Sequence, residues 1–130
     1  MKRNLFVLLV LVLLLLTLGA SGEVSSNLFS QKKYNGYGKV SEMRYVDAQG
    51  NTVMADNLGY AIVRYTYNTY RQQTQEAYFD AQGNPVNCVR GYHQANTKIN
   101  ARRLVIERNY KDVDGNYVML SKHYLIIKTN

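Results

Sequence analysis

After residue 22, no stretch of the chain repeats its apolar residues with a helical period over three turns. Short runs of aromatic and β-branched residues occur instead, and these residue types favour the pleated, half-buried surface of a sheet. Residues 60–67, Tyr-Ala-Ile-Val-Arg-Tyr-Thr-Tyr, are one such run. The pattern therefore predicts an all-β chain with little helix. The expected strand segments are residues 28–34, 37–45, 53–55, 60–67, 73–79, 92–99, 103–110, 117–120 and 125–127.

The first two expected strands are joined by the dipeptide Asn35-Gly36. Asn-Gly suits a two-residue type I′ turn, in which both central residues take positive φ. This dipeptide predicts a tight β-hairpin at the start of the domain. Further reversals of the chain are expected at residues 68–71 and near residues 100–101, each between two strand segments.

One turn sequence recurs three times along the chain. Residues 47–51 and 80–84 both read Asp-Ala-Gln-Gly-Asn, residues 112–116 read Asp-Val-Asp-Gly-Asn, and their first residues lie 33 and 32 positions apart. The flanks recur in register, with a tyrosine two residues before each Asp and a valine two residues after each Asn. The flanking residues are Tyr45, Tyr78 and Tyr110, followed by Val53, Val86 and Val118, and then by Tyr60, Tyr92 and Tyr124. The chain is therefore an internal repeat of about 32 residues.

The residue types in these turns explain the repeat in physical terms. An Asp at the first position can accept hydrogen bonds from backbone N–H groups two residues further on. The Gly three residues later can take the positive φ that the loop needs before the chain returns. We therefore interpret these residues as structural turn formers. They are Asp47, Gly50, Asp80, Gly83, Asp112 and Gly115.

Together these observations predict stacked antiparallel β-hairpins that form an open meander or a short solenoid. The expected domain covers residues 23–130, with units of about 28–59, 60–91 and 92–124 and a terminal strand at 124–128. The terminal strand aligns with the first strand of a further unit. Its apolar edge either folds back on the body or pairs with a second chain in an edge-strand homodimer, and the pattern leaves both open.

The first 22 residues have the composition of a secretory signal peptide. A short basic start precedes an apolar run from Leu5 to Leu18, and small residues follow it. We expect a signal helix, cleavage near Gly22 and Glu23, and a secreted or cell-surface protein. The alternative is an uncleaved leader that anchors the chain in a membrane, although the run is short for a membrane span.

The charge of the remaining chain indicates an acidic partner. Its net charge falls from +7 to +5 without the leader, because Lys2 and Arg3 lie there. A mild positive excess favours anionic wall polymers or lipid headgroups. The basic pairs Lys32-Lys33 and Arg102-Arg103 do not form the dense stripe of a nucleic-acid-binding protein, so no nucleic-acid partner is expected.

The single cysteine, Cys88, cannot form an internal disulfide. In the repeat it takes the place of Ala55 and Leu120, which is an apolar position. A free cysteine usually behaves as a small hydrophobic residue, so we expect a buried thiol, with a reactive or intermolecular thiol as the alternative.

The sequence contains no recognisable catalytic, metal or cofactor motif. His93 and His123 occupy non-equivalent repeat positions and lack the close ligand spacing of a metal site. Residues 112–115 resemble part of a calcium loop, but the distal Glu of such a loop is missing. Glu42 and Glu107 occupy equivalent positions, which indicates cross-strand charge pairing rather than a catalytic acid and base. We therefore expect a protein that is not an enzyme.

Tyrosine is the unusual feature of the composition, because the chain has 12 tyrosines and no tryptophan. These rings can form ladders inside the sheet, where cross-strand aromatic pairs add stability. Alternatively, some rings line an exposed face and stack on sugars or on side chains of a partner. For that second reading we identify a candidate binding cluster around one hairpin. Its members are Tyr65, Tyr67 and Tyr70, with Arg64 and Arg71 as hydrogen-bond donors.

Residues 78–86, Tyr-Phe-Asp-Ala-Gln-Gly-Asn-Pro-Val, together with Gly91-Tyr92, resemble two groups of extracellular repeats. One is the YD repeat of Rhs-type proteins, which implies β-hairpins that build a long shell. The other is the glucan- and cell-wall-binding repeat. The resemblance implies an exported, non-catalytic module that binds a cell-wall glycan or a surface protein. The alternative is a structural fragment or remnant of a larger repeat protein, and an enzyme is the third choice.

Overall fold

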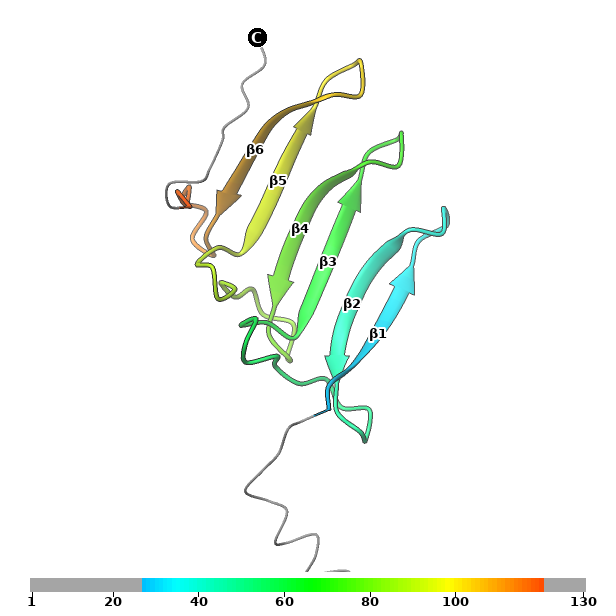
Figure 1. Ribbon diagram of the computed structural model, residues 1–130, viewed down its shortest axis with the longest axis vertical. Helices are drawn as coiled ribbons and strands as arrows, with labels where there is room; N and C mark the ends of the chain where they lie inside the picture. Colours follow the sequence, from blue (N-terminus) through cyan, green and yellow to red (C-terminus); the bar gives the residue numbers. More distant parts are fainter. Residues whose placement is uncertain (1–26, 121–130) are drawn as a thin grey trace, which may run out of the picture.

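The computed structural model describes residues 27–120, and this part of the chain is all-β. It contains six antiparallel strands in one open sheet and no helix, and the sheet does not close into a barrel (Figure 1). The strands follow each other in the sheet in chain order. They are β1 (Phe29–Tyr34), β2 (Val40–Val46), β3 (Ile62–Tyr67), β4 (Gln73–Phe79), β5 (Gln94–Ile99) and β6 (Val105–Lys111).

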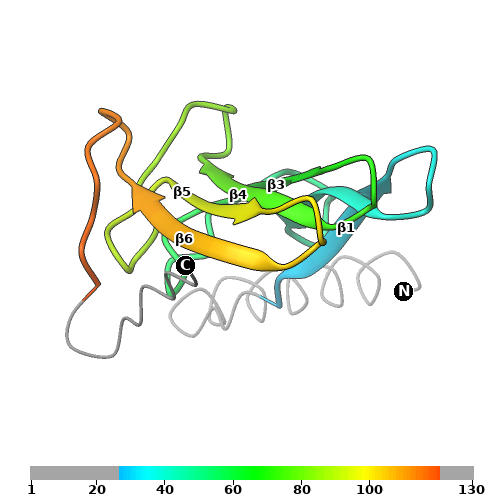
Figure 2. The same ribbon diagram turned by 90° about the horizontal axis from the view of Figure 1, so that it is seen from above.

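The sheet consists of three hairpins, one from each repeat: β1–β2, β3–β4 and β5–β6. The same register joins neighbouring hairpins, since Glu42 lies opposite Arg64 and the equivalent Gln75 lies opposite Asn96. The three hairpins stand side by side with their turns at the same end of the sheet. The strands splay because the sheet is twisted (Figures 1 and 2). The predicted open meander is confirmed.

The hairpin ends depart from the predicted two-residue turn. The Asn35 N–H donates to the carbonyl of Lys39 at 2.8 Å, so the first loop contains five residues, 35–39. The Oδ1 of Asn35 accepts hydrogen bonds from the N–H groups of Tyr37 and Lys39, both at 3.0 Å. The type I′ prediction was therefore wrong, because the asparagine side chain organises a wider loop and Gly38, not Gly36, has positive φ.

We call the loops that join the two strands of each hairpin the tip loops, and they are residues 35–39, 68–72 and 100–104. In all three, Oδ1 of the first Asn accepts two backbone hydrogen bonds. The opposite end of the sheet carries the base loops, which are residues 47–51, 80–84 and 112–116. There, Oδ1 of the first Asp accepts the same two bonds.

The base loops confirm the turn chemistry read from the repeat. Asp47 accepts the N–H of Gln49 at 2.9 Å, two residues on, as the sequence predicts. Gly50, Gly83 and Gly115 have φ values of 84°, 85° and 83°. Each glycine therefore occupies the left-handed region in which a side chain would be strained.

The connections between hairpins contain fewer strands than the sequence predicts. Residues 53–55 and 117–120 form only isolated bridging contacts, and β3 and β5 begin two residues later than expected. The reason is that each connection makes single hydrogen bonds to the sheet, such as the Val53 N–H to the carbonyl of Tyr45 at 3.0 Å. Several expectations lie outside the described residues, namely the predicted signal peptide, His123 and the expected strands at 124–128 and 125–127.

A continuous row of tyrosine rings crosses the sheet and forms a large part of the core, and we call it the tyrosine ladder. Its centroids are 6.0 Å apart between Tyr45 and Tyr60, 4.5 Å between Tyr60 and Tyr78, 5.8 Å between Tyr78 and Tyr92, and 4.5 Å between Tyr92 and Tyr110. Rings from strands alternate with rings from the connections. The predicted ladder of tyrosines is thus confirmed as a large part of the core.

Candidate binding site at the hairpin tips

The five residues of the predicted binding cluster lie in three different places. Tyr65 is half-buried and packs against the core, while the half-buried Tyr67 donates its hydroxyl hydrogen to the carbonyl of Val40 at 2.6 Å. Arg64 points to the opposite face of the sheet, because neighbouring residues of a strand alternate in direction. Tyr70 and Arg71 lie in the second tip loop. The structure therefore keeps Tyr65 and Tyr67 together on one face of β3. Tyr70 and Arg71 share the tip loop, and Arg64 lies apart from both pairs.

The half-buried position of Tyr65 also changes its chemistry. Burial, followed by the nearby charge of Glu76, raises the pKa of Tyr65 to about 12. Burial likewise raises the pKa of Tyr78 and Tyr92 in the ladder. These hydroxyl groups remain neutral at any physiological pH and serve the fold.

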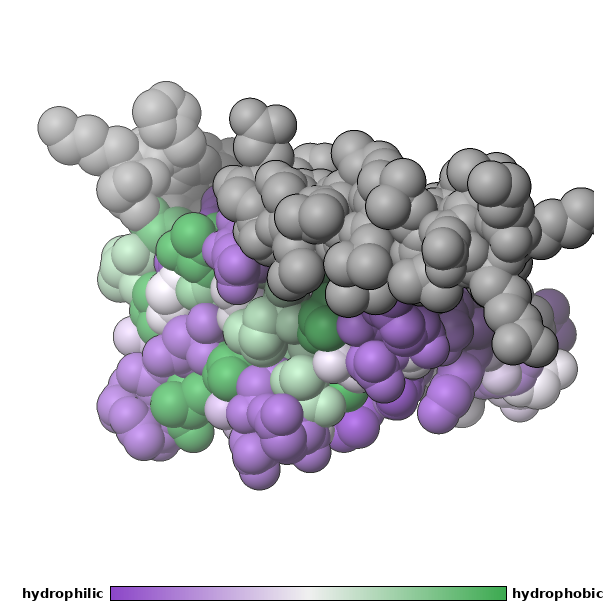
Figure 3. Space-filling model, turned by 90° about the horizontal axis from the view of Figure 1, so that it is seen from below, coloured by the Kyte–Doolittle hydropathy of each residue, from purple (hydrophilic) through white to green (hydrophobic). Residues whose placement is uncertain are grey.

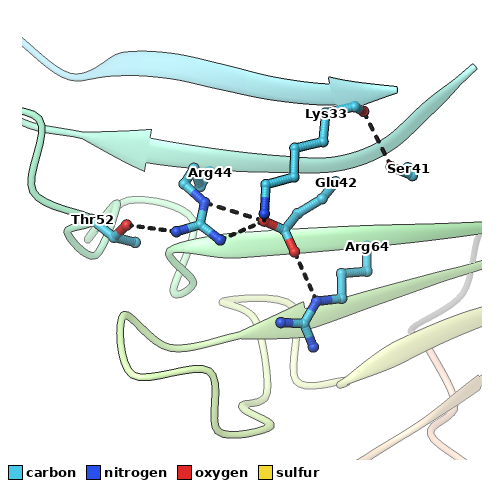
Figure 4. Close-up of polar contacts among 6 residues, drawn as sticks. All are labelled: Lys33, Ser41, Glu42, Arg44, Thr52 and Arg64. Carbon is cyan, nitrogen blue, oxygen red and sulfur yellow. Dashed lines mark hydrogen bonds and ion pairs between the residues drawn. The ribbon is translucent and has the colours of Figure 1, made fainter. Parts of the chain in front are cut away.

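Arg64 belongs to a cluster of charges around Glu42 on the polar face of the sheet (Figure 4). The Nε of Arg64 donates to Glu42 at 3.0 Å, Arg44 donates to the other carboxylate oxygen, and the Lys33 ammonium lies 3.6 Å away. The Arg64 guanidinium also lies 4.3 Å from the centroid of the Phe79 ring. The cross-strand charge pairing predicted for Glu42 is confirmed, and it engages Arg64 internally.

Glu42 predicts a specific loss of stability in acid. Burial alone would raise its pKa, but hydrogen bonds from Arg44 and Arg64 and the charges of Arg44 and Lys33 outweigh it and hold the pKa at about 2. Because the folded pKa lies below the unfolded one, the stabilisation is present above the unfolded pKa of about 4.3 and is lost as pH falls towards about 2.

We expect Glu42→Gln to lower the free energy of unfolding by roughly 1–2 kcal/mol at neutral pH, with the difference from wild type shrinking below about pH 4. Urea unfolding at a series of pH values measures it. A constant difference from neutral pH down to acid would mean that the carboxylate charge contributes nothing.

The tip loops hold an alternating row of arginines and tyrosines that connects neighbouring hairpins, and we call this the tip row. Arg71 lies 4.9 Å from the centroid of the Tyr37 ring, and Arg103 lies 4.2 Å from that of Tyr70. Arg102 continues the row in the third loop. Tyr37 and Tyr70 remain 64% and 52% exposed, and the arginines of the row are exposed as well, so both rings and cations face solvent.

Three of these residues were missed by sequence reasoning. Tyr37 was assigned to a strand, and Arg102 and Arg103 were read only as a basic pair. A signal was present, because the three loops begin with Asn35, Asn68 and Asn100 at spacings of 33 and 32 residues. Aligning the tip loops in addition to the base loops would have placed these residues together.

Arg71 and Arg103 have an unusual backbone conformation. Their φ values are 64° and 65°, and they are the only residues other than glycine with positive φ in the described part of the chain. A side chain in this region costs about 1–2 kcal/mol. The equivalent residue of the first tip loop is Gly38, with φ of 74° and no strain. Strain retained at two exposed arginines points to a role other than stability.

The tip loops and the base loops carry opposite charges. The tip loops contain Lys39, Arg71, Arg102 and Arg103 and no acidic residue, whereas the base loops contain four Asp and no basic residue. Both kinds of loop use the same hydrogen bonds to Oδ1, so an amide or a carboxylate can close them. The use of Asn in the tip loops and Asp in the base loops therefore changes the charge of each set of loops but not its geometry.

The remaining candidate residues show no catalytic arrangement in the described part of the chain. Cys88 is buried in the core, as predicted, and Nδ1 of His93 lies 3.2 Å from the carbonyl of Val86 while its ring packs against Phe79. Asp112 uses its carboxylate to accept the N–H of Asp114. No group of three potential metal ligands occurs among residues 27–120.

Seen from below, as in Figure 3, hydrophobic areas lie among hydrophilic ones on the described surface. Large exposed apolar side chains occur near the base loops, with Val89 68% and Met119 79% exposed. No helix in the described residues is suited to crossing a membrane. Comparisons with protein-family models, curated proteins and solved structures give no match to this chain.

Proposed function

We propose that the protein is an exported, non-catalytic binding module whose tip row attaches to an acidic component of a cell surface. The observation that carries this proposal is the choice of Asn over Asp in all three tip loops. An Asp would close the loop equally well but would place a negative charge beside the arginines. A row of cations without acids favours anionic partners.

The form of the row also suits binding. Arg71 and Arg103 each lie over a tyrosine ring, and the attraction between cation and ring stabilises the pair. The contact also restricts the arginine side chains before binding, so less conformational entropy is lost when a ligand binds. The rings themselves are exposed, and each combines an apolar face with a polar tip. A signal peptide, as predicted for residues 1–22, would deliver this surface to the outside of the cell, where anionic wall polymers are one class of acidic partner.

The alternative is that the hairpins are a structural part of a larger repeat protein of the YD or Rhs type. The identical register between neighbouring hairpins favours this alternative, because further hairpins could pair in the same way. The two roles separate experimentally, since a purely structural hairpin array needs no cationic tips.

The test is the double variant Arg71→Gly with Arg103→Gly. Glycine at these positions removes the backbone strain, so the free energy of unfolding should stay the same or rise by about 1 kcal/mol. Retention of the full chain on purified anionic cell-wall material should fall at least tenfold at low salt. Sedimentation with the wall material and urea unfolding measure the two effects on the same samples.

The matched control is Arg90→Gln with Lys111→Gln, which removes two cations near the base loops. These cations lie over Tyr92 and Tyr117, away from the tips. The control should retain binding within about twofold, because it removes the same number of positive charges but leaves those of the tips in place. Equal loss in both double variants would show that net charge, and not the tip row, governs attachment, and unchanged binding in the glycine variant would refute the proposal.

A further inference from the structure

We infer that the ligand of the tip row is a linear polymer of phosphate groups that lies across the strands and touches all three tip loops at once. This inference rests on the proposed function and narrows it to one ligand class and one orientation. It depends on the spacing of the tips, on the groups they leave free and on how rigidly they are held.

The spacing follows from the sheet. Paired strands lie about 4.8 Å apart, so tips of successive hairpins stand at least about 10 Å apart and the three tips span at least about 20 Å. Each tip contributes at least one exposed cation, namely Lys39, Arg71, and the pair Arg102 and Arg103. The cations therefore form a line at right angles to the strands, and a linear anion can meet them in turn.

The charged groups exposed at the tip loops are guanidinium and ammonium groups, which only donate hydrogen bonds, and the tyrosine hydroxyl groups beside them can donate as well as accept. Oδ1 of each first Asn is occupied by backbone N–H groups. Within residues 27–120, neither Arg71 nor Arg103 forms an ion pair with a carboxylate. A ligand that offers acceptors and negative charge without donors fits this surface. Guanidinium groups bind the oxygens of both phosphates and carboxylates in a bidentate manner, and a phosphate polymer presents such oxygens in every unit.

The tips are also held to each other. Arg71 of the second loop rests on Tyr37 of the first, and Arg103 of the third rests on Tyr70 of the second. The side-chain amide of Gln72 donates to the carbonyl of Arg103 at 2.9 Å. Contacts between loops fix the relative positions of the cations, so a ligand that spans them gains from each tip without ordering the others.

The experiment is calorimetric titration of the full chain with inorganic polyphosphates of defined length, at low and at moderate salt. Chains longer than the span of at least about 20 Å should bind at least tenfold more tightly per chain than pyrophosphate, because the second and third contacts become intramolecular. The plot of log K against log salt concentration has a negative slope, and Arg71→Gln and Arg103→Gln should each make it less steep by roughly 0.7. Lys111→Gln near the base should leave the slope unchanged.

Further probes decide between sources of the same charge. Binding of lipoteichoic-type wall polymer but not of anionic phospholipid vesicles is the expected result, and the reverse would overturn a linear polymer as the ligand in favour of a lipid headgroup. Equal or tighter binding of polyglutamate would overturn the assignment to phosphate, and equal or tighter binding of an oligothymidylate would overturn a cell-surface source of the phosphate polymer.

The outcome also separates this inference from the proposed function. Affinity that does not depend on polyphosphate length would overturn the spanning mode but leave attachment through the tips intact. No binding to any polyanion, with wall attachment still lost in the glycine variant, would overturn the ligand class alone. If the arginine variants lost neither polyphosphate binding nor wall attachment, both this inference and the proposed function would be overturned.

Discussion

Tyr78→Ala is expected to lower the free energy of unfolding by about 3–5 kcal/mol, which is enough to unfold much of a domain of this size. Tyr78 stands at the centre of the tyrosine ladder, is only 6% exposed and contacts the rings of Tyr60 and Tyr92. Removing it interrupts the row and leaves a cavity between two hairpins. Urea unfolding followed by circular dichroism measures the change.

Two controls test this explanation. Tyr78→Phe keeps the ring and should cost about 1 kcal/mol or less, since only the hydroxyl group is lost. Tyr34→Ala removes a tyrosine that is 61% exposed and should change stability by less than about 0.5 kcal/mol. If the alanine variant at Tyr78 were no less stable than that at Tyr34, the ladder would not be a large part of the core.

Gly59→Ala is expected to cost about 3 kcal/mol or more. Gly59 has φ of 80°, and a Cβ atom there would lie 2.8 Å from the backbone nitrogen of Val89. That nitrogen donates to the carbonyl of Leu58 at 2.9 Å, in a hydrogen bond that ties the first connection to the second. A backbone atom cannot move aside as a flexible side chain can, so the variant must break this bond and accept the strained φ.

Gly83→Ala provides the matched control. Gly83 has nearly the same φ, 85°, but no atom lies within 4 Å of an added Cβ. It should therefore cost only the conformational penalty of about 1–2 kcal/mol. Thermal unfolding of the two variants compares a steric effect with a purely conformational one. Equal melting temperatures would mean that the contact between the connections does not support the fold.

The local elements of this protein could be read from its sequence because their chemistry is local. A base loop needs one side-chain acceptor and one positive φ, and both residues lie within four positions of each other. The recurrence of these pairs with flanking tyrosines and valines indicated the hairpins, their number and their open arrangement. The asparagine of the first tip loop was misread because Asn35-Gly36 suits a tighter turn equally well by local criteria.

The binding surface was harder to find because it is not local. Tyr65 and Tyr70 are near each other in the chain, yet one packs against the core and the other is exposed at a tip. Which face of a strand becomes core depends on where the connections cross the sheet, and only side chains of distant residues decide that.

Thus the sequence alone determined the β-hairpin unit, its base turns and its tyrosine content, since each depends on backbone preferences over a few residues. Only the tertiary structure decided that Tyr37 and Arg71, 34 positions apart, form one contact at the tips. Pairing of neighbouring hairpins side by side brings equivalent loops to neighbouring positions at the same end of the sheet. The physical reason is that strand pairing converts a period in sequence into a spacing of at least about 10 Å in space.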